Sequence, residues 1–437
     1  MRSPALTDLL RTLPEASVEL VRRVLACADT RRQRVYLVGG PVRDWLMGRR
    51  LRDVDLTVEL HKGEDATELA HRVSAGKLRV RVHERFGTVT LQGTGAALDL
   101  ATVRREQYAR DGALPTVEEG TLEEDLRRRD FSVNALAIPL SAAARARRVG
   151  IVDVTGGLED LEARSLRILH ARSFHDDPTR ALRAARLAPR LGFTLSRHSR
   201  AALRAALRDG AFGAVSGDRL RREWVKLFGD AAGQGLDPAR SLRLLHDWHV
   251  LGALEPGLEL DGRAVTPLRR LGRALVEPPW PAGQRRVWVA GMAAWLAPLR
   301  APLRRRVLAR LAISGDQATR ISEFPRRRDA WLRALERARG RGAVDLLLSG
   351  CDEESLLALH AWAPPAARRR IARWAVEDRG RRVPVTGDDL MAMGLTGPVL
   401  GRVLERLRVA WLDGSVRTRE EALVLAHEIS RRSRSKS

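Results

Sequence analysis

The chain of 437 residues is 44% hydrophobic, which is typical of a globular protein with two to four structural units and argues against an intrinsically disordered chain. No run of eighteen apolar residues occurs, and the first twenty residues include three acidic ones, so neither a membrane span nor a secretory signal is expected. The net charge of +24 predicts a polyanionic partner such as nucleic acid, although almost all of this charge is arginine, a bias that codon composition also produces.

The N-terminal part of the chain is predicted to mix helices and strands. Apolar residues recur at helical spacing over residues 1–29. Residues 35–38 then form a short apolar strand that ends at Gly39-Gly40, and residues 42–48 suit a helix. Residues 53–58 alternate with the period of two that marks a half-buried strand.

Later segments complete a sheet and then change to helices. Strands are expected at residues 78–82, 87–91 and 97–103, which predicts a sheet of about four or five strands. After a last apolar segment at residues 151–154, the chain is rich in Leu, Ala and Arg with helical periodicity. Breaks between these helices are predicted at 210–217, 229–235, 256–262, 277–283, 340–342 and 379–387.

The first pattern that carries chemistry lies within seventeen residues. Gly39-Gly40 ends a strand before a helix, where backbone N–H groups can approach a phosphate, and Arg43 can add a charged contact. Asp53 and Asp55 are one residue apart on a predicted strand, so both project from one face and can hold Mg²⁺. A glycine pair is a common turn and an Asp-x-Asp strand is usually a solvated face, but the combination in this order favours a catalytic metal site.

Residues 35–58 resemble the signature of the class II tRNA nucleotidyltransferase and bacterial poly(A) polymerase family, within the polymerase-beta-like superfamily. Further similarity follows in the order of that family over roughly residues 30–230. These segments are Arg85–Val89, Leu98–Glu106, Leu122–Ala137 with its Arg-Arg-Asp motif, Ile151–Leu161, Asp176–Arg186 followed by Leu191–Phe193, and Val215–Glu223.

The resemblance implies an α+β protein with a polymerase-beta-like nucleotidyltransferase head and an all-helical remainder. We expect a catalytic head at residues 1–150, a nucleotide-selecting neck at 151–230, and an RNA-binding body and tail at 231–340 and 341–437. It also implies Asp53 and Asp55 as catalytic metal ligands, Mg²⁺ as cofactor, and tRNA, CTP and ATP as partners.

The nucleotide-binding residues that the resemblance implies agree with their chemistry. Arg129 can fork onto phosphate, and Asp130 can accept a sugar hydroxyl. The alternative for Arg129 is an exposed basic patch, but the apolar stretch that follows Asp130 favours a buried, oriented carboxylate. Gly39, Gly40 and Arg43 complete the expected triphosphate site.

A second set lies on a predicted helix. Asp177 and Arg180 are three residues apart, so they share a face and can imitate a Watson–Crick edge for an incoming base. On residues alone a surface salt bridge is the better interpretation, and the resemblance reverses that preference. Arg183 and Arg186 then extend the phosphate-facing surface.

Two positions depart from or extend the family pattern. Asp176 stands where the family commonly has Glu, which puts the support of the selecting carboxylate in doubt. Asp99 lies on a predicted strand where other members of the superfamily hold a third metal carboxylate, and it is a weak candidate here.

The family contains enzymes that add CCA, CC or only the final A to tRNA, and poly(A) polymerases. The polar connection from Glu106 to Leu122 is long enough to be the flexible loop that CC-adding enzymes lack in part. The segment from Leu187 to Leu195 does not resemble the basic signature of the poly(A) polymerases. The expected order is therefore CCA addition, then A-only addition, then poly(A) synthesis.

Two other classes of function are weaker alternatives. The intact motifs argue against a non-catalytic RNA-binding protein, and the long arginine-rich helical half argues against nucleotide transfer to a small molecule.

Residues 285–341 are dense in arginine, with Trp288, Trp295 and Trp331 between, which predicts RNA contacts beside solvated helix faces. The tryptophans are expected mainly in the core. Cys27 and Cys351 are isolated, so a cytoplasmic protein without disulfides or zinc is expected.

Overall fold

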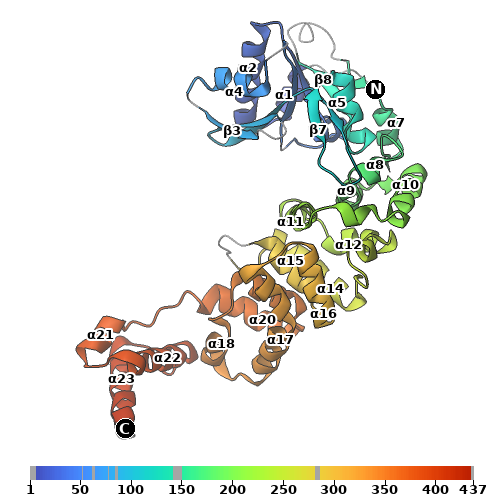
Figure 1. The fold of residues 1–437 in the computed structure, drawn as a ribbon. Helices are drawn as coiled ribbons and strands as arrows, with labels where there is room; N and C mark the ends of the chain where they lie inside the picture. Colours follow the sequence, from blue (N-terminus) through green and yellow to red (C-terminus); the bar gives the residue numbers. More distant parts are fainter. Residues whose placement is uncertain are drawn as a thin grey trace. The chain divides into compact units, whose positions relative to one another are not determined.

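The computed structural model describes residues 6–51, 53–61, 64–76, 78–83, 87–140, 150–280 and 286–434. The chain forms two compact units, Met1–Val215 and Ser216–Ser437, and each is described by itself (Figure 1). The first unit holds a mixed sheet and the second is helical, which confirms the predicted α+β class. The predicted division at residues 150, 230 and 340 stays a prediction.

A seven-stranded sheet organises the first unit, in the order β3-β4-β5-β2-β1-β8-β9. The neighbouring strands are antiparallel except for β2 and β5, which run parallel and set Asp55 opposite Asp99. The strands are β1 (Arg34–Val38), β2 (Asp55–Glu59), β3 (Arg79–His83), β4 (Thr88–Gly93), β5 (Ala96–Thr102), β8 (Leu136–Pro139) and β9 (Val152–Asp153).

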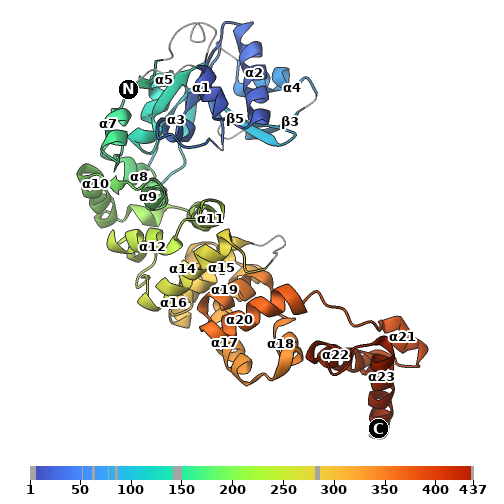
Figure 2. The ribbon, with the colours of Figure 1, turned by 180° about the vertical axis from the view of Figure 1, so that it is seen from behind.

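Strand alternation separates the two faces of this sheet. On β1, Val35 and Leu37 join the larger core, while Tyr36 and Val38 join a second cluster on the opposite face. The larger core is formed with helices α1 (Leu6–Arg11), α2 (Glu15–Asp29) and α4 (Ala66–Ser74). Helices α2 and α4 lie side by side against the sheet in both ribbon views (Figures 1 and 2).

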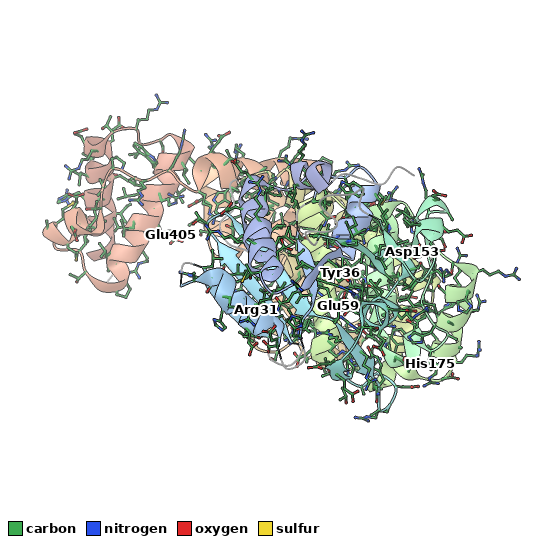
Figure 3. The ribbon with its side chains drawn as sticks, turned by 90° about the horizontal axis from the view of Figure 1, so that it is seen from above. Arg31, Tyr36, Glu59, Asp153, His175 and Glu405 are labelled. Carbon is green, nitrogen blue, oxygen red and sulfur yellow. The ribbon has the colours of Figure 1, made fainter. Side chains whose placement is uncertain are left out.

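The face of Tyr36 is the more polar one. Tyr36 Oη donates to Glu59 Oε2 at 2.9 Å between β1 and β2, and the two side chains lie next to each other in Figure 3. Burial, together with the neighbouring Glu59 carboxylate, raises the pKa of Tyr36 to about 12, so this hydroxyl stays a donor. Asp55 and Thr57 project from β2 toward the same side as Glu59.

Three expectations for this region were wrong in detail. The sheet has seven strands in the described residues, because the continuous apolar segment after Ala135 forms β8 and the segment after Ile151 forms β9. The predicted helix at 1–29 is two helices, separated before Glu15 by Pro14, which has φ −58° and ψ 142°. The strand predicted at 53–58 begins only at Asp55, so Asp53 lies just before it.

The predicted loop from Glu106 to Leu122 is partly a β-hairpin. Strands β6 (Arg104–Gln107) and β7 (Thr116–Glu119) pair antiparallel. The tip of the hairpin contacts α8 (Ser173–Asp176): Gly112 N donates to His175 O at 2.8 Å, and Arg172 pairs with Asp111 at 2.5 Å. The tip also lies against the end of η3 (Ala211–Ala214): a Cβ at Gly112 would lie 2.9 Å from Ala214 Cβ, so a larger residue would disturb that packing.

Short elements complete the first unit. A two-residue parallel bridge joins β10 (Ser165–Leu166) and β11 (Thr194–Leu195). The remaining elements are α3 (Gly40–Leu46), α5 (Leu122–Arg127), η2 (Ser132–Asn134), α7 (Gly157–Glu162), α9 (Thr179–Leu191), α10 (Arg197–Arg208) and η3 (Ala211–Ala214).

The second unit contains only helices and connections among its described residues. Trp224 and Trp295 are both fully buried and pack with ring centroids 4.7 Å apart. Of the three tryptophans expected mainly in the core, Trp295 is therefore buried, whereas Trp288 and Trp331 are half-buried. The helices are α11 (Gly217–Gln234), α12 (Pro238–Asp247), α13 (Val250–Leu254), α14 (Gly262–Val276), α15 (Val287–Leu296), α16 (Ala301–Arg310), α17 (Gly315–Arg337), α18 (Gly340–Leu348), α19 (Glu353–Trp362), α20 (Pro365–Arg373), the π-helix η4 (Trp374–Asp378), α21 (Gly387–Ala392), α22 (Gly397–Asp413) and α23 (Arg419–Arg434).

One predicted break in this unit was too long. Helix α11 continues through Gly229 and Gly233 and ends at Gly235, which takes the left-handed conformation with φ 69°. No helix in the described part of the chain is long and apolar enough to cross a membrane.

Candidate active site

The turn between β1 and α3 is built around Gly39. Gly39 has φ 75°, a conformation that glycine adopts without strain, and its N–H donates to Leu136 O at 3.0 Å. A Cβ at Gly39 would lie only 2.7 Å from Arg129 Nη1. The turn and the guanidinium of Arg129 are therefore packed directly against each other.

The two predicted metal ligands lie close together but differ in environment. Asp53 is exposed, and Asp55 is half-buried at the start of β2. Val54 between them is buried, which agrees with projection of both carboxylates away from the core. Burial, then the negative charge of Asp99, raises the pKa of Asp55 to about 6; Asp53 adds to this rise and Arg129 opposes it.

Asp99 belongs to the same face of the sheet. It sits opposite Asp55 in the parallel register, and its Oδ1 accepts from Thr90 Oγ1 at 2.6 Å. Among the described residues no group of three or more His, Cys, Asp or Glu side chains is arranged to hold a metal ion.

Arg43 is held inside the protein. It is 2% exposed, and it donates to Asp44 Oδ1 at 2.7 and 2.8 Å and to Asn134 Oδ1. Burial lowers the pKa of Arg43, although Asp44 opposes that effect. Its Nη2 lies 3.5 Å from the point that a Cβ at Gly40 would occupy, and its predicted contact to a triphosphate stays a prediction.

Asp130, the carboxylate of the Arg-Arg-Asp motif, is buried and has three partners. Arg183 Nη2 pairs with its Oδ2 at 2.9 Å, while Asn134 Nδ2 and Phe131 N donate to its Oδ1 at 2.9 and 2.8 Å. Burial by itself would raise the pKa of Asp130, but Arg183 and these hydrogen bonds outweigh it and hold the pKa below its ordinary value. The carboxylate is thus ionised and oriented, as the apolar stretch after it suggests.

The predicted base-selecting pair is placed differently from the expectation. Asp177 is not on the helix: it precedes α9, and its Oδ1 accepts from Thr179 N at 3.1 Å and from Thr179 Oγ1 at 2.6 Å. Arg180 is 3% exposed, and it donates to Ser173 Oγ and to Arg128 O, the latter at 2.9 Å. Asp177 lies two residues before the start of α9 and Arg180 is the second residue of that helix, so the two residues do not share a helix face.

The other two predicted nucleotide-binding arginines, Arg183 and Arg186, are half-buried on α9. Arg183 pairs with Asp130 as described, and Arg186 follows three residues later on the same helix. The aspartate that replaces the common Glu, Asp176, ends α8, and its Oδ2 lies 3.7 Å from His170 Nε2.

Sequence reasoning missed three residues that order this site. Asp125 binds Arg128 and Arg129, Asn134 joins Arg43 to Asp130, and Ser173 accepts from Arg180. Asn134 and Asp125 fall within the segment that resembles the family, so that segment held the only available signal.

Residues 35–167 match the Poly A polymerase head domain family, a range that runs from β1 to the end of β10. An A-adding tRNA nucleotidyltransferase from Geobacter sulfurreducens is 30% identical over an alignment of 430 residues that covers 95% of this chain and 47% of that protein. In its head domain and over most of its length, the chain is similar to class II tRNA nucleotidyltransferases and bacterial poly(A) polymerases. The resemblance stated from the sequence is therefore confirmed.

Other relatives in this family carry different product names. A CC-adding tRNA nucleotidyltransferase from Deinococcus radiodurans is 40% identical over 227 residues, covering 51% of this chain and 56% of that protein. A Multifunctional CCA protein from Stenotrophomonas maltophilia is 33% identical, covering 61% and 60%. The chain thus spans about half the length of the curated relatives it matches.

Solved structures of the family resemble the whole chain. A CCA-adding enzyme in its apo form II superposes with a TM-score of 0.76 at 27% identity, covering 98% of this chain and all of that one. A Thermotoga maritima CCA-adding enzyme complexed with tRNA has a TM-score of 0.71 at 25% identity, covering 98% of both chains. A CCA-adding enzyme complexed with CTP has a TM-score of 0.72 at 26% identity, covering 97% of this chain and 98% of that one.

The arginine-dense stretch of this chain is largely occupied by internal contacts. Arg304, 7% exposed, donates to Leu299 O at 2.7 Å and to Ser322 O at 3.1 Å. Others pair with carboxylates: Arg286 with Asp316, Arg306 with Glu255, Arg327 with Glu323, and Arg341 with Glu377 and Asp378. Arg85, Phe86 and Arg285 lie outside the described residues.

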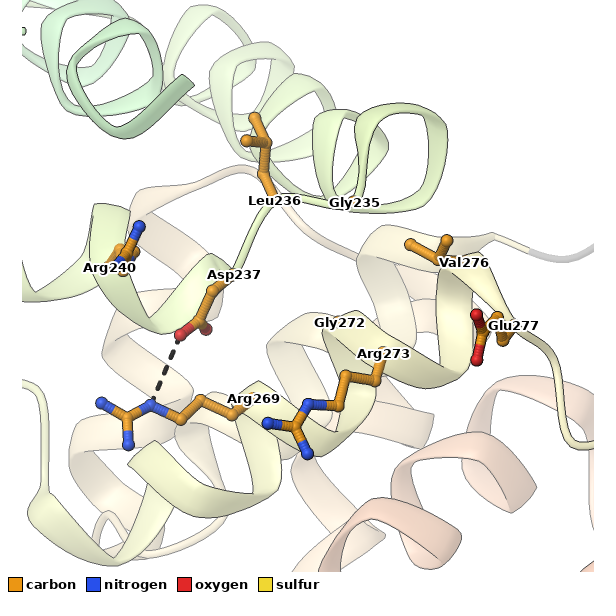
Figure 4. A pocket seen from close by; sticks show the side chains of 9 residues that line it. All are labelled: Gly235, Leu236, Asp237, Arg240, Arg269, Gly272, Arg273, Val276 and Glu277. Carbon is orange, nitrogen blue, oxygen red and sulfur yellow. Dashed lines mark ion pairs between the residues drawn. The ribbon is translucent and has the colours of Figure 1, made fainter. Parts of the chain in front are cut away.

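A cavity of about 520 Å³ presents other arginines of the second unit (Figure 4). It lies between the end of α11, the start of α12 and the last turns of α14. Arg240, Arg269 and Arg273 line it and are exposed, and Arg269 Nε lies 3.4 Å from Asp237 Oδ2. A Cβ at Gly272 would lie 2.9 Å from Pro238 Cδ, so this glycine allows α14 to approach the turn before α12 closely.

Proposed function

We propose that this protein is a template-independent nucleotidyltransferase that adds nucleotides to the 3′ end of tRNA. The observation that carries the proposal is the proximity of Asp55 and Asp53 to the Gly39 turn and Arg129, on the polar face of the sheet. Acidic ligands beside a glycine turn and a guanidinium suit a nucleoside triphosphate, whose phosphates need both a cation and close backbone approach. The similarity to this family adds the polynucleotide acceptor.

The carboxylates fit a divalent cation, and we propose Mg²⁺ held by Asp53 and Asp55. Burial, and then the negative charge of Asp99, makes the ionised form of Asp55 unfavourable and raises its pKa, and a bound cation would relieve this cost. Carboxylate oxygens are hard ligands that Mg²⁺ prefers. When bound, it neutralises phosphate charge and favours ionisation of the attacking hydroxyl.

In the proposed reaction, the 3′-oxygen of the RNA bonds to the α-phosphorus while the bond to the bridging oxygen of the β-phosphate breaks. Pyrophosphate leaves, and no covalent enzyme intermediate forms. Arg129 faces the developing phosphate charge from beside Gly39. Asp130 keeps Arg183 in place and offers an oriented carboxylate for the ribose.

We assign the choice of base to Asp177 and Arg180. Arg180 is held from two sides, by Ser173 and by the carbonyl of Arg128, so its remaining donor direction is fixed. Such orientation is what discrimination by hydrogen bonds requires. The Arg180→Ala variant should narrow the ratio of kcat/KM between CTP and ATP, and an unchanged ratio would refute this role.

Among the possible products we propose CCA, made from CTP and ATP. The hairpin of β6 and β7 is present where CC-adding enzymes lack part of the loop. A-only addition is the second candidate, because the Geobacter relative that covers 95% of this chain is named A-adding. Poly(A) synthesis ranks third.

One incorporation experiment separates these products. Purified protein is offered three tRNA transcripts that end before CCA, after C and after CC, with CTP and ATP, and the products are sequenced. Completion of all three supports CCA addition. Extension of only the third supports A-only addition, a long adenosine tail supports poly(A) synthesis, and no extension overturns the proposed function.

A further inference from the structure

We propose that Asp125 is a positioning residue that aligns the two ends of the nucleotide site by holding Arg128 and Arg129 together. This inference rests on the proposed function, since it concerns the alignment of the nucleotide in that same site. Asp125 lies on α5, outside the set of side chains that would touch a substrate, and it is fully buried.

Each oxygen of the Asp125 carboxylate holds a different arginine. Oδ1 accepts from Arg128 Nε at 3.0 Å and from Arg128 Nη2 at 2.6 Å, and Oδ2 accepts from Arg129 Nη2 at 2.9 Å. Burial would raise the pKa of Asp125, but the charges of Arg129 and Arg128 outweigh it and hold the pKa below its ordinary value. A single ionised group therefore fixes two adjacent guanidinium groups.

The helix that carries Asp125 is itself firmly placed. Thr121 and Glu124 form a capping box that fixes the first residue of α5. Leu122 N also donates to Glu59 Oε1 on β2 at 3.2 Å. The carboxylate of Asp125 is thus tied to the strand that begins with the catalytic Asp55.

Arg129 transmits this position to the phosphate end of the site. Its Nη1 lies 2.7 Å from the point that a Cβ at Gly39 would occupy. Movement of Arg129 would therefore change the wall of the glycine turn.

Arg128 transmits the position to the base end. Its carbonyl accepts from Arg180 Nη2 at 2.9 Å, and its Nη1 donates to Glu106 Oε1 at 2.8 Å on the hairpin. Arg128 and Arg129 are adjacent in the chain, so Asp125 sets the distance between the base-selecting and phosphate-facing groups. Alignment of this kind affects rate strongly, because small displacements of bound groups reduce reactivity.

The test is the isosteric variant Asp125→Asn, compared with Arg129→Lys and the double variant. We expect Asp125→Asn to reduce kcat/KM by about 10–100-fold and to bring the kcat/KM values for CTP and ATP closer together, because Arg128 and Arg129 are then no longer held in place. In the Arg129→Lys background the same change should reduce kcat/KM for CTP by a clearly smaller factor, since the two residues act together. Independent, multiplicative effects, or an unchanged nucleotide ratio, would overturn the positioning role.

A matched control and a second variant keep the test decisive. Asp345, 2% exposed in the second unit, is likewise a buried carboxylate that binds arginine: its two oxygens accept from Arg408 at 2.5 and 2.7 Å, and Oδ1 also accepts from Trp374 Nε1 at 2.8 Å. Asp345→Asn should lower thermal stability and leave the nucleotide ratio unchanged, and an equal change of the ratio would also overturn the inference. If Asp125→Asn does not fold, Asp125→Glu keeps the charge and displaces the carboxylate, and it faces the same criteria. Failure of the wild type to incorporate any nucleotide would instead contradict the proposed function.

Discussion

Arg183 of α9 pairs with Asp130 across the first unit, with Nη2 2.9 Å from Oδ2, and so joins α9 to the Arg-Arg-Asp motif. The carboxylate is 5% exposed, whereas 40% of the Arg183 side chain is accessible. The carboxylate of the pair is therefore buried, whereas the guanidinium is partly accessible to solvent.

The Arg183→Met variant should be less stable than the wild type by roughly 1–2 kcal/mol at pH 7, because it leaves Asp130 buried without its charged partner while water can still enter. The pKa of Asp130 is depressed in the folded protein, so its stabilisation is present above the ordinary Asp range. It is lost as the pH falls through the folded pKa. Denaturant unfolding at pH 7 and near pH 3 measures both effects.

Arg204 offers the control for this prediction, because it is exposed on α10 of the same unit. Arg204→Met should change the free energy of unfolding by less than about 0.5 kcal/mol. A difference between Arg183→Met and the wild type that persists unchanged at low pH would contradict the assignment to Asp130.

Gly39→Ala should reduce nucleotide incorporation, and the reduction should be larger than in a variant with similar backbone strain elsewhere in the first unit. The change places a side chain at φ 75° and a Cβ 2.7 Å from Arg129 Nη1, so Arg129 must move. Gly48 has a similar φ of 69° with nothing within 4 Å of a Cβ. Both substitutions place a side chain at positive φ and strain the backbone by roughly 1–3 kcal/mol, and only the first touches the site.

The comparison of the two alanine variants isolates the contact with Arg129. The midpoint temperature of thermal unfolding should fall by similar amounts in both variants, while the rate of single-nucleotide incorporation should fall by about tenfold or more in Gly39→Ala alone. Equal loss of activity in both variants would show that backbone strain, and not the contact, is responsible.

Asp55→Asn should stabilise the metal-free protein while abolishing incorporation. The pKa of Asp55 is raised to about 6 from an ordinary value of 3.8, so its ionisation weakens folding. The cost begins above about pH 4 and is complete above about pH 6, where it amounts to at most ~3 kcal/mol. The variant removes this cost together with a metal ligand.

Unfolding midpoints in EDTA and in Mg²⁺ test this prediction. In EDTA the variant should be the more stable protein at pH 8 and equal to the wild type near pH 3. Added Mg²⁺ should stabilise the wild type and have little effect on the variant. A wild type that is as stable as Asp55→Asn at pH 8 in EDTA would disprove the uncompensated charge at this position.

The sequence was sufficient for the parts of the site that depend on local order. Gly39-Gly40 before a helix and the alternation from Asp55 onward are local patterns, and the structure has both. Asp53 was predicted on a strand and Asp177 on a helix, but each lies two residues before the element begins, because the ends of elements depend on neighbouring segments.

Features that depend on distant partners could not be predicted. Asp125 is an ordinary acidic helix residue until folding buries it beside Arg129, and Arg43 appears available until Asn134, 91 residues later, accepts from it. The strand β8 was missed because a continuous apolar segment does not distinguish a buried strand from a helix. The arginines of residues 286–341 were predicted to contact RNA, but several of them bind carboxylates that are distant in the sequence. Arg306, for example, pairs with Glu255, about 50 residues earlier in the chain.

The arginines around the cavity of the second unit give a last prediction, for the RNA. Arg240 and Arg273 are exposed on α12 and α14 and line a concave surface, so we expect them to contact backbone phosphates. Arg240→Gln and Arg273→Gln should each weaken tRNA binding and reduce the slope of log K against log salt by roughly 0.7–0.9. Arg263, on the same helix α14, is exposed but pairs with Asp261 at 2.7 Å, so Arg263→Gln is the matched control and should change the slope little. Filter binding of labelled tRNA from 50 to 200 mM salt, roughly the range over which such contacts are lost, measures the slopes. Equal losses in all three variants would mean that the overall positive field, and not this cavity, attracts the RNA.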